Sequence, residues 1–152
     1  MKATDLLKKQ HKEVKALFKK VENTEGARER RRLMNEISIA LEGHTAIEEE
    51  MFYPAVRGLE TQKAEEMVLE AFEEHHVVKL VLAELPKVDP ADERFEAKMT
   101  VLSELVEHHA DEEEKEMFKV AQKLGKGELE ALGEQMEARF EAFRGKAGRQ
   151  AA

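Results

Sequence analysis

The chain has 152 residues, the length of a single domain, and carries a net charge of −8. It contains no cysteine, which excludes disulfides, zinc–thiolate sites, iron–sulfur clusters and cysteine nucleophiles, so any metal must be bound by histidine and carboxylate. Few prolines and glycines argue against an all-β fold, and the lack of a basic block among aromatic residues argues against a nucleic-acid partner. No apolar run approaches the length of a signal peptide or a membrane span, so we expect a cytoplasmic protein with no membrane partner.

Apolar residues recur at steps of three and four along most of the chain, which indicates amphipathic helices. The first is expected over 4–23 with Thr4 as its N-cap, and a second follows Gly26 and ends near Gly58, with Pro54 straining its last turns. A third begins after Thr61 and ends at Leu85. The remaining expectations are a fourth helix from an Asp89-Pro90 cap to Leu124, a shorter fifth over 128–143, and a frayed end over 144–152.

Four long helices with short connections predict an all-α fold, an antiparallel up-down-up-down four-helix bundle with a short additional C-terminal helix. We expect the bundle over 1–125 and the C-terminal helix with its frayed tail over 126–152. Met136, Phe140 and Phe143 either cover the bundle or contact a second subunit or protein partner. Gly43 lies inside the second helix, where one explanation for a glycine is the close approach of another helix.

The two halves of the chain resemble one another. The segment 11–18 aligns with 75–82 at an offset of 64 residues, and 44–49 aligns with 109–114 at an offset of 65, with Tyr53 matching Phe118. Two helix pairs in the same order predict a bundle with pseudo-twofold symmetry, whose halves supply equivalent groups.

Each long helix carries a histidine in the middle of its apolar stripe, and in two of them a glutamate follows four residues later on the same face. Imidazoles and carboxylates buried in an apolar core are costly without a partner, and a metal ion removes that cost. The set is too large for one closed zinc site and suits two ions bridged by carboxylates, with iron as the leading candidate and zinc or manganese as alternatives. The predicted ligands are His11, His44, Glu48, His75, His109 and Glu113.

Two neighbouring pairs compete for the same roles. His108 with Glu112 has the same spacing as His109 with Glu113, and the apolar neighbours and the repeat favour the second pair. Similar reasoning favours His75 over His76, which leaves His76 and His108 as solvated groups or as partners of the ligands. Tyr53 is interpreted as a packing residue at a helix end, with a hydrogen bond or electron transfer near the site as the alternative.

The blocks Gln10-His11, 44–54 (HTAIEEEMFYP), Glu73-Glu74-His75 and 108–114 (HHADEEE) resemble the bacterial hemerythrin-like (HHE cation-binding) domain over roughly 4–125. The resemblance implies that the six residues bind a non-heme di-iron centre of two iron ions, bridged by the two glutamates and an oxo or hydroxo group. Oxygen-carrying members have a fifth histidine where this chain has Lys79, so the chain is similar to the histidine-poorer branch and simple oxygen transport is not implied.

The expected function is that of a di-iron protein that binds or reacts with O2, peroxide or NO, with peroxide decomposition as its enzymatic form. No separate acid–base residue is identifiable in the sequence, so whether the chain is an enzyme is left open. The alternative is an iron-, oxygen- or redox-sensing module without turnover, read by a protein partner. A third reading is a helical bundle with no metal.

Overall fold

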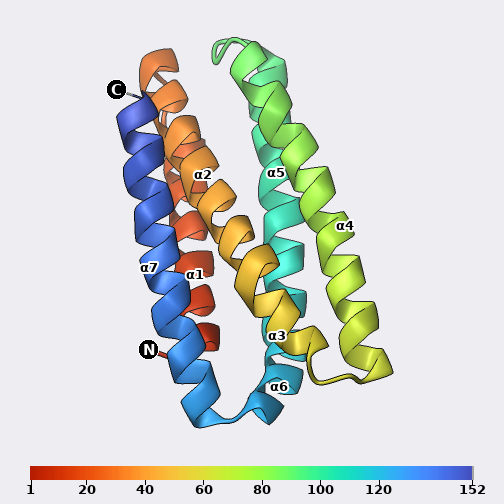
Figure 1. Cartoon of the computed structure of the whole chain (residues 1–152). Coiled ribbons are helices and arrows are strands. Elements are labelled where there is room, and N and C mark those ends of the chain that lie inside the picture. The colour runs from red at the N-terminus through yellow and green to blue at the C-terminus, as the bar shows by residue number, and fades with distance from the viewer. Residues whose placement is uncertain (152) are drawn as a thin grey trace.

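The computed structural model describes residues 1–151, which form an antiparallel bundle of four long helices with a fifth helix against it (Figure 1). The expected all-α, up-down-up-down architecture is confirmed. The four long helices are α1 (Ala3–Glu22), α2 (Ala27–Ile47), α4 (Gln62–Glu84) and α5 (Glu93–Glu112). The shorter α3 (Tyr53–Arg57) and α6 (Phe118–Ala121) continue the second and fourth helices, and α7 (Lys126–Ala151) follows.

The second and fourth helices each contain one π-helical turn, where we expected regular α-helix. These turns span Glu48–Phe52 and Glu113–Met117, and each begins at a glutamate of the predicted site. Pro54 does not by itself account for the first turn, because the equivalent position in the second half, 54 + 65 = 119, is Lys119. A π turn inserts one residue, so both Phe52 and Tyr53 face the core and are fully buried.

Two helix starts differ from expectation. Lys2 is the N-cap of α1, and Thr4 is buried inside the helix because the N-terminus lies against α7. The side chain of Asp89 accepts from the backbone N–H of Ala91 in a turn, so α5 begins later, with Asp92 as its cap. Thr61 caps α4 by accepting a hydrogen bond from the N–H of Ala64, and this helix starts where it was expected.

The C-terminal helix is longer than predicted, because α7 continues to Ala151 instead of ending near residue 143 and fraying from 144. It lies beside α1 and α2 along the outside of the bundle (Figure 1). Leu129 and Met136 are buried against the bundle, which supplies the packing that keeps these turns helical. Residue 152 lies outside the described residues.

Close approach of a second helix at Gly43 is confirmed, and that helix is α7. A Cβ atom on Gly43 would lie 2.8 Å from the ring of Phe140 and 3.0 Å from that of Phe143. Arg139 also makes a two-pronged ion pair with Glu50, at 2.9 and 3.1 Å, which joins α7 to the first π turn.

The apolar interior consists of two clusters. One includes Ile47, Phe52 and Met117, near the π turns, and the other includes Phe18, Leu33 and Phe95, toward the opposite end of the bundle. The buried histidines lie along their helices between the two clusters: His11 falls between Leu7 of the first and Val14 of the second, and His75 between Ala71 and Val78. Among the described residues, no helix combines the length and the apolar character needed to cross a bilayer.

Candidate metal centre

The six predicted ligands converge in the middle of the bundle, and all of them are buried. Glu48 and Glu113 lie at the starts of the two π turns, and one histidine comes from each of α1, α2, α4 and α5. They form two groups that each offer four ligand atoms within 4.8 Å of one another. The first comprises His11, His44, Glu48 and Glu113, and the second Glu48, His75, His109 and Glu113.

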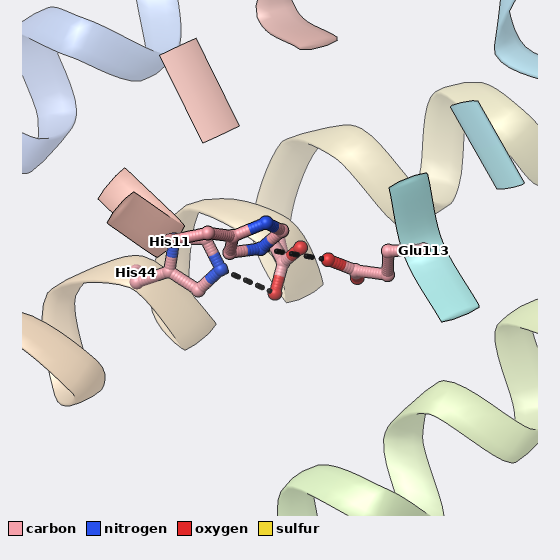
Figure 2. A group of neighbouring side chains, drawn as sticks. His11, His44 and Glu113 are labelled. Atoms are coloured by element: carbon pink, nitrogen blue, oxygen red, sulfur yellow. Dashed lines mark ion pairs between the residues drawn. The ribbon is translucent and has the colours of Figure 1, made fainter. Parts of the chain in front are cut away.

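The two glutamates are shared by both groups. Glu113 Oε1 lies 3.2 Å from Nε2 of His11, and its Oε2 lies 3.2 Å from Nε2 of His109. Glu48 Oε1 lies 3.1 Å from Nε2 of both His44 and His75. Figure 2 shows the side chains of His11, His44 and Glu113 pointing toward one another. A carboxylate that reaches both groups has the placement of a bridging ligand.

The other ring nitrogen of each histidine points outward to a side-chain oxygen. Because these oxygens only accept hydrogen bonds, Nδ1 carries the proton and donates, which leaves Nε2 facing the centre. This is the tautomer that binds a metal through Nε2. The pairs are His11 with Glu114 at 2.9 Å, His44 with Gln10 at 2.7 Å, His75 with Glu49 at 2.7 Å and His109 with Glu74 at 2.8 Å.

Several buried atoms in this cluster have no hydrogen-bond partner within the part of the chain that the structure describes. They are His11 Nε2, His44 Nε2, Glu48 Oε2 and Glu113 Oε1. The Nε2 atoms of His75 and His109 also face each other at 3.1 Å, an arrangement in which one nitrogen at most can donate to the other. Unpartnered donors and acceptors are rare in protein interiors, and a cation between these atoms would satisfy all of them. The residues therefore fit a metal site.

In the absence of a metal ion, the buried histidines and carboxylates shift one another's pKa values. Burial lowers the pKa of His11, His75 and His109, but the carboxylates around them outweigh burial and raise it above its ordinary value. Burial raises the pKa of Glu48, and the imidazoles of His44, His109 and His75 outweigh it and hold that pKa well below its usual range. A bound cation would replace the protons that the imidazoles otherwise retain.

Tyr53 is part of the centre, not merely a packing residue. Its hydroxyl donates to Glu113 Oε2 and lies 3.1 Å from Nε2 of His75 and 3.2 Å from Nε2 of His109. Burial and the carboxylates of Glu113 and Glu48 raise its pKa well above the ordinary value, so the hydroxyl keeps its proton at neutral pH. Its repeat partner Phe118 stacks on His11 at 6.1 Å and has no hydroxyl, so the two halves of the centre differ.

A small cavity of about 20 Å³ touches all four histidines. Its other walls include the apolar side chains of Val14, Leu41, Val78 and Val106. A volume of this size holds one water-sized molecule, and apolar walls exclude larger polar ones. The centre therefore has room for a small ligand beside the imidazoles.

Comparison with known proteins decides the family. The hemerythrin HHE cation-binding domain matches residues 2–121. An uncharacterized protein of Mycobacterium tuberculosis is 34% identical over 148 residues, 95% of this chain and 89% of that protein, and one of Mycobacterium bovis matches equally. The chain belongs to the hemerythrin HHE cation-binding family. The crystal structure of a hemerythrin HHE cation-binding domain-containing protein from Mycobacterium kansasii has the same fold, with a TM-score of 0.85 and 32% identity over 96% of this chain and 89% of that one.

In this hemerythrin-like chain the neighbouring histidines take the outer positions. His76 is exposed, and His108 has a side-chain exposure of 67% and lies beside Glu74 and Glu112. Lys79, at the position of the fifth histidine, points outward and its Nζ lies 2.8 Å from Glu49. Glu49 thus holds both Lys79 and His75.

The outer partners of the histidines were missed by the sequence reasoning. A usable signal was present in the repeat. Gln10 and Glu74 differ by 64 residues, and Glu49 and Glu114 by 65, so each pair occupies equivalent positions. Because both members of each pair hold an Nδ1 atom, the hemerythrin-like pseudo-symmetry extends to these supporting side chains.

Proposed function

We propose that the chain binds two metal ions, with iron as the leading candidate, through its buried histidines and glutamates. Glu48 and Glu113 act as bridges, and the ligand set is His11, His44, Glu48, His75, His109 and Glu113. The observation that carries this proposal is the pair of overlapping four-residue groups, in which four buried inward atoms have no hydrogen-bond partner among the described residues. We further propose that the centre binds or reacts with O2, peroxide or NO, because the adjoining cavity admits only a small ligand.

The protein would contribute ligands, orientation and an apolar surround to this chemistry. Gln10, Glu49, Glu74 and Glu114 hold the imidazoles in the required tautomer, and Tyr53 keeps a proton beside Glu113. Two adjacent irons would supply the exchange of two electrons. Peroxide decomposition fits this capacity, because one peroxide is oxidised to O2 while a second is reduced to two waters.

Metal analysis of the purified protein, with a visible absorption spectrum before and after hydrogen peroxide, tests the proposal. We expect about two irons per chain, charge-transfer bands in the visible region, and oxygen evolution on adding peroxide. Absence of metal after reconstitution with ferrous iron would contradict the metal centre. Bound iron without oxygen evolution would contradict turnover and favour the sensing module.

Replacement of a bridging glutamate tests the ligand assignment. In Glu48→Gln or Glu113→Gln we expect metal content to fall from about two ions per chain to one or fewer, because a neutral amide is a poor bridge. The matched control is Glu50→Gln, in the same π turn but exposed, which should keep the full complement. Full occupancy in both bridging variants would show that the two glutamates are not bridges.

A further inference from the structure

A second group of ligand-type side chains lies on the surface beside the buried centre. Glu74 on α4 and His108 and Glu112 on α5 offer ligand atoms within 4.8 Å of one another. Nε2 of His108 lies 3.4 Å from Glu112 Oε1 and 3.9 Å from Glu74 Oε2. Imidazole and carboxylate together form a donor set for divalent transition metals.

This surface group is physically connected to the centre. Glu74 uses its other oxygen, Oε1, to accept from Nδ1 of His109 at 2.8 Å. A cavity of about 30 Å³ is lined by Glu74 and Glu112 and also by the buried His109 and Glu113. The same cavity therefore touches the two carboxylates of the surface group, Glu74 and Glu112, and two predicted ligands of the centre, while His108 lies beside those carboxylates outside its lining.

The carboxylates along this cavity become progressively more buried. Glu70 and Glu116 are exposed, Glu74 and Glu112 are half-buried, and Glu113 is 2% exposed. No lysine or arginine of the described chain forms an ion pair with Glu74 or Glu112. A cleft lined by one sign of charge raises the local concentration of ions of opposite charge.

The equivalent surface in the other half of the repeat is closed. By the repeat offsets of 65 and 64 residues, His108 corresponds to Gly43, Glu112 to Ile47 and Glu74 to Gln10. None of these side chains is charged, and the rings of Phe140 and Phe143 on α7 cover Gly43. Ligand-type side chains next to the centre therefore face solvent on the α4–α5 side, opposite to where α7 packs.

We propose that Glu74, His108 and Glu112 bind a divalent cation at the surface and deliver it to Glu113 and His109. This inference rests on the proposed function, since it needs the buried centre to take up metal. The six central residues are buried, so a hydrated ion exchanges its water for protein ligands on the way in, and the cavity lined by Glu74 and Glu112 offers carboxylates for that exchange. Carboxylates of increasing burial replace that water one ligand at a time.

The test measures how fast the metal-free protein takes up Co²⁺, followed by visible absorption in a stopped-flow instrument. The variant is His108→Ala with Glu112→Gln, two exposed or half-exposed positions outside the central ligand set. Glu74 is left intact because it also orients His109. The matched control is His76→Ala with Glu73→Gln, which removes the same residue types and the same charge at exposed positions away from the cavity.

We expect the variant to load Co²⁺ about tenfold more slowly or worse, with a weaker dependence on salt, while reaching the same final absorption as the unmodified protein. The control should load at the unmodified rate. Equal rates in the variant and the unmodified protein would overturn the inference, and so would equal slowing in the control. If the unmodified protein takes up neither Co²⁺ nor ferrous iron, the proposed function itself fails, which is distinguishable from slow uptake by the variant alone.

Discussion

Each inward-facing imidazole in this protein is fixed by a partner behind it. The Nδ1 atoms donate to Glu114, Gln10, Glu49 and Glu74 at 2.7–2.9 Å, so the rings are oriented whether or not a cation lies between the Nε2 atoms. Such preorganisation lowers the entropy that metal binding would otherwise cost. Without a cation, the neighbouring carboxylates of Glu48 and Glu113 raise the pKa of His11, His75 and His109, so these three rings hold their protons more tightly than a free imidazole.

The raised pKa values of His11, His75 and His109 predict how stability of the metal-free protein depends on pH. A histidine whose pKa is higher in the folded state stabilises fully below its unfolded value of 6.5 and loses that contribution as pH rises through the folded value. The metal-free protein should therefore be less stable at pH 9 than at pH 6, by about 1 kcal/mol or more.

Urea unfolding at the two pH values measures this difference. The metal-loaded protein is the control, because there the imidazoles bind as neutral ligands and the loss with rising pH should disappear. Equal unfolding midpoints for the metal-free protein at pH 6 and pH 9 would contradict the protonated state assigned to these histidines.

The Tyr53 hydroxyl should stabilise the metal-free centre more than the loaded one. Tyr53→Phe keeps the ring, as Phe118 does in the other half, and removes the donor to Glu113. We expect a loss of about 1–3 kcal/mol in the metal-free protein, because a buried carboxylate oxygen loses one of its two partners and keeps only Nε2 of His109. Thermal unfolding with and without metal measures it, and a loss that is equal in both forms would show that Glu113 does not exchange this hydrogen bond for a cation.

At each π turn two consecutive apolar side chains are buried in the core. Phe52 with Tyr53 and Met117 with Phe118 are all buried. Because both turns start at a predicted bridging glutamate, the irregularity is a shared feature of the halves and not an accident of Pro54.

Packing of α7 depends on the absence of a side chain at Gly43. Alanine normally favours a helix over glycine by about 1 kcal/mol, but here its Cβ would press on Phe140 at 2.8 Å. Gly43→Ala should therefore destabilise the protein by about 1–3 kcal/mol. Gly148→Ala, where an added Cβ meets nothing within 4 Å, is the matched control and should be neutral or stabilising. Urea unfolding midpoints report both, and a Gly43→Ala protein as stable as the control would contradict the close contact.

The centre joins all four long helices between two apolar clusters, so metal should stabilise the bundle as a unit. Each helix contributes one histidine, and the two glutamates connect the halves. A ligand that binds only the folded chain raises its unfolding temperature.

Chelator treatment tests that coupling. We expect the unfolding temperature to fall by about 5 °C or more when bound metal is removed, and to recover when ferrous iron is returned without oxygen. Magnesium in place of iron is the control, since it prefers all-oxygen ligands and should restore little. Identical unfolding with and without chelator would leave only a helical bundle.

Much of the fold followed from the sequence because its signals are local. The 3.6-residue spacing that marks a helix face also placed four histidines and two glutamates on the core side, and the repeat related the two halves. The short connections then required antiparallel neighbours. The helix stripes and the connections depend on residues within a few turns of one another, and the repeat appears when two stretches of sequence are aligned, so none of these features requires knowledge of a tertiary contact.

Tertiary structure decided what depends on residues far apart in the chain. The hydrogen bonds between Gln10 and His44, between Glu74 and His109, and between Tyr53 and Glu113 each join different helices. The spacing of residues along one helix does not predict contacts between helices. The length of α7 also depends on α1 and α2, because apolar side chains of α7 are buried against them. The apolar pattern of the α7 sequence is weak by itself. The local sequence pattern therefore identified the central residues. Packing between helices determined their hydrogen-bond partners, their tautomers and the exposure of ligand-type side chains on the α4–α5 side.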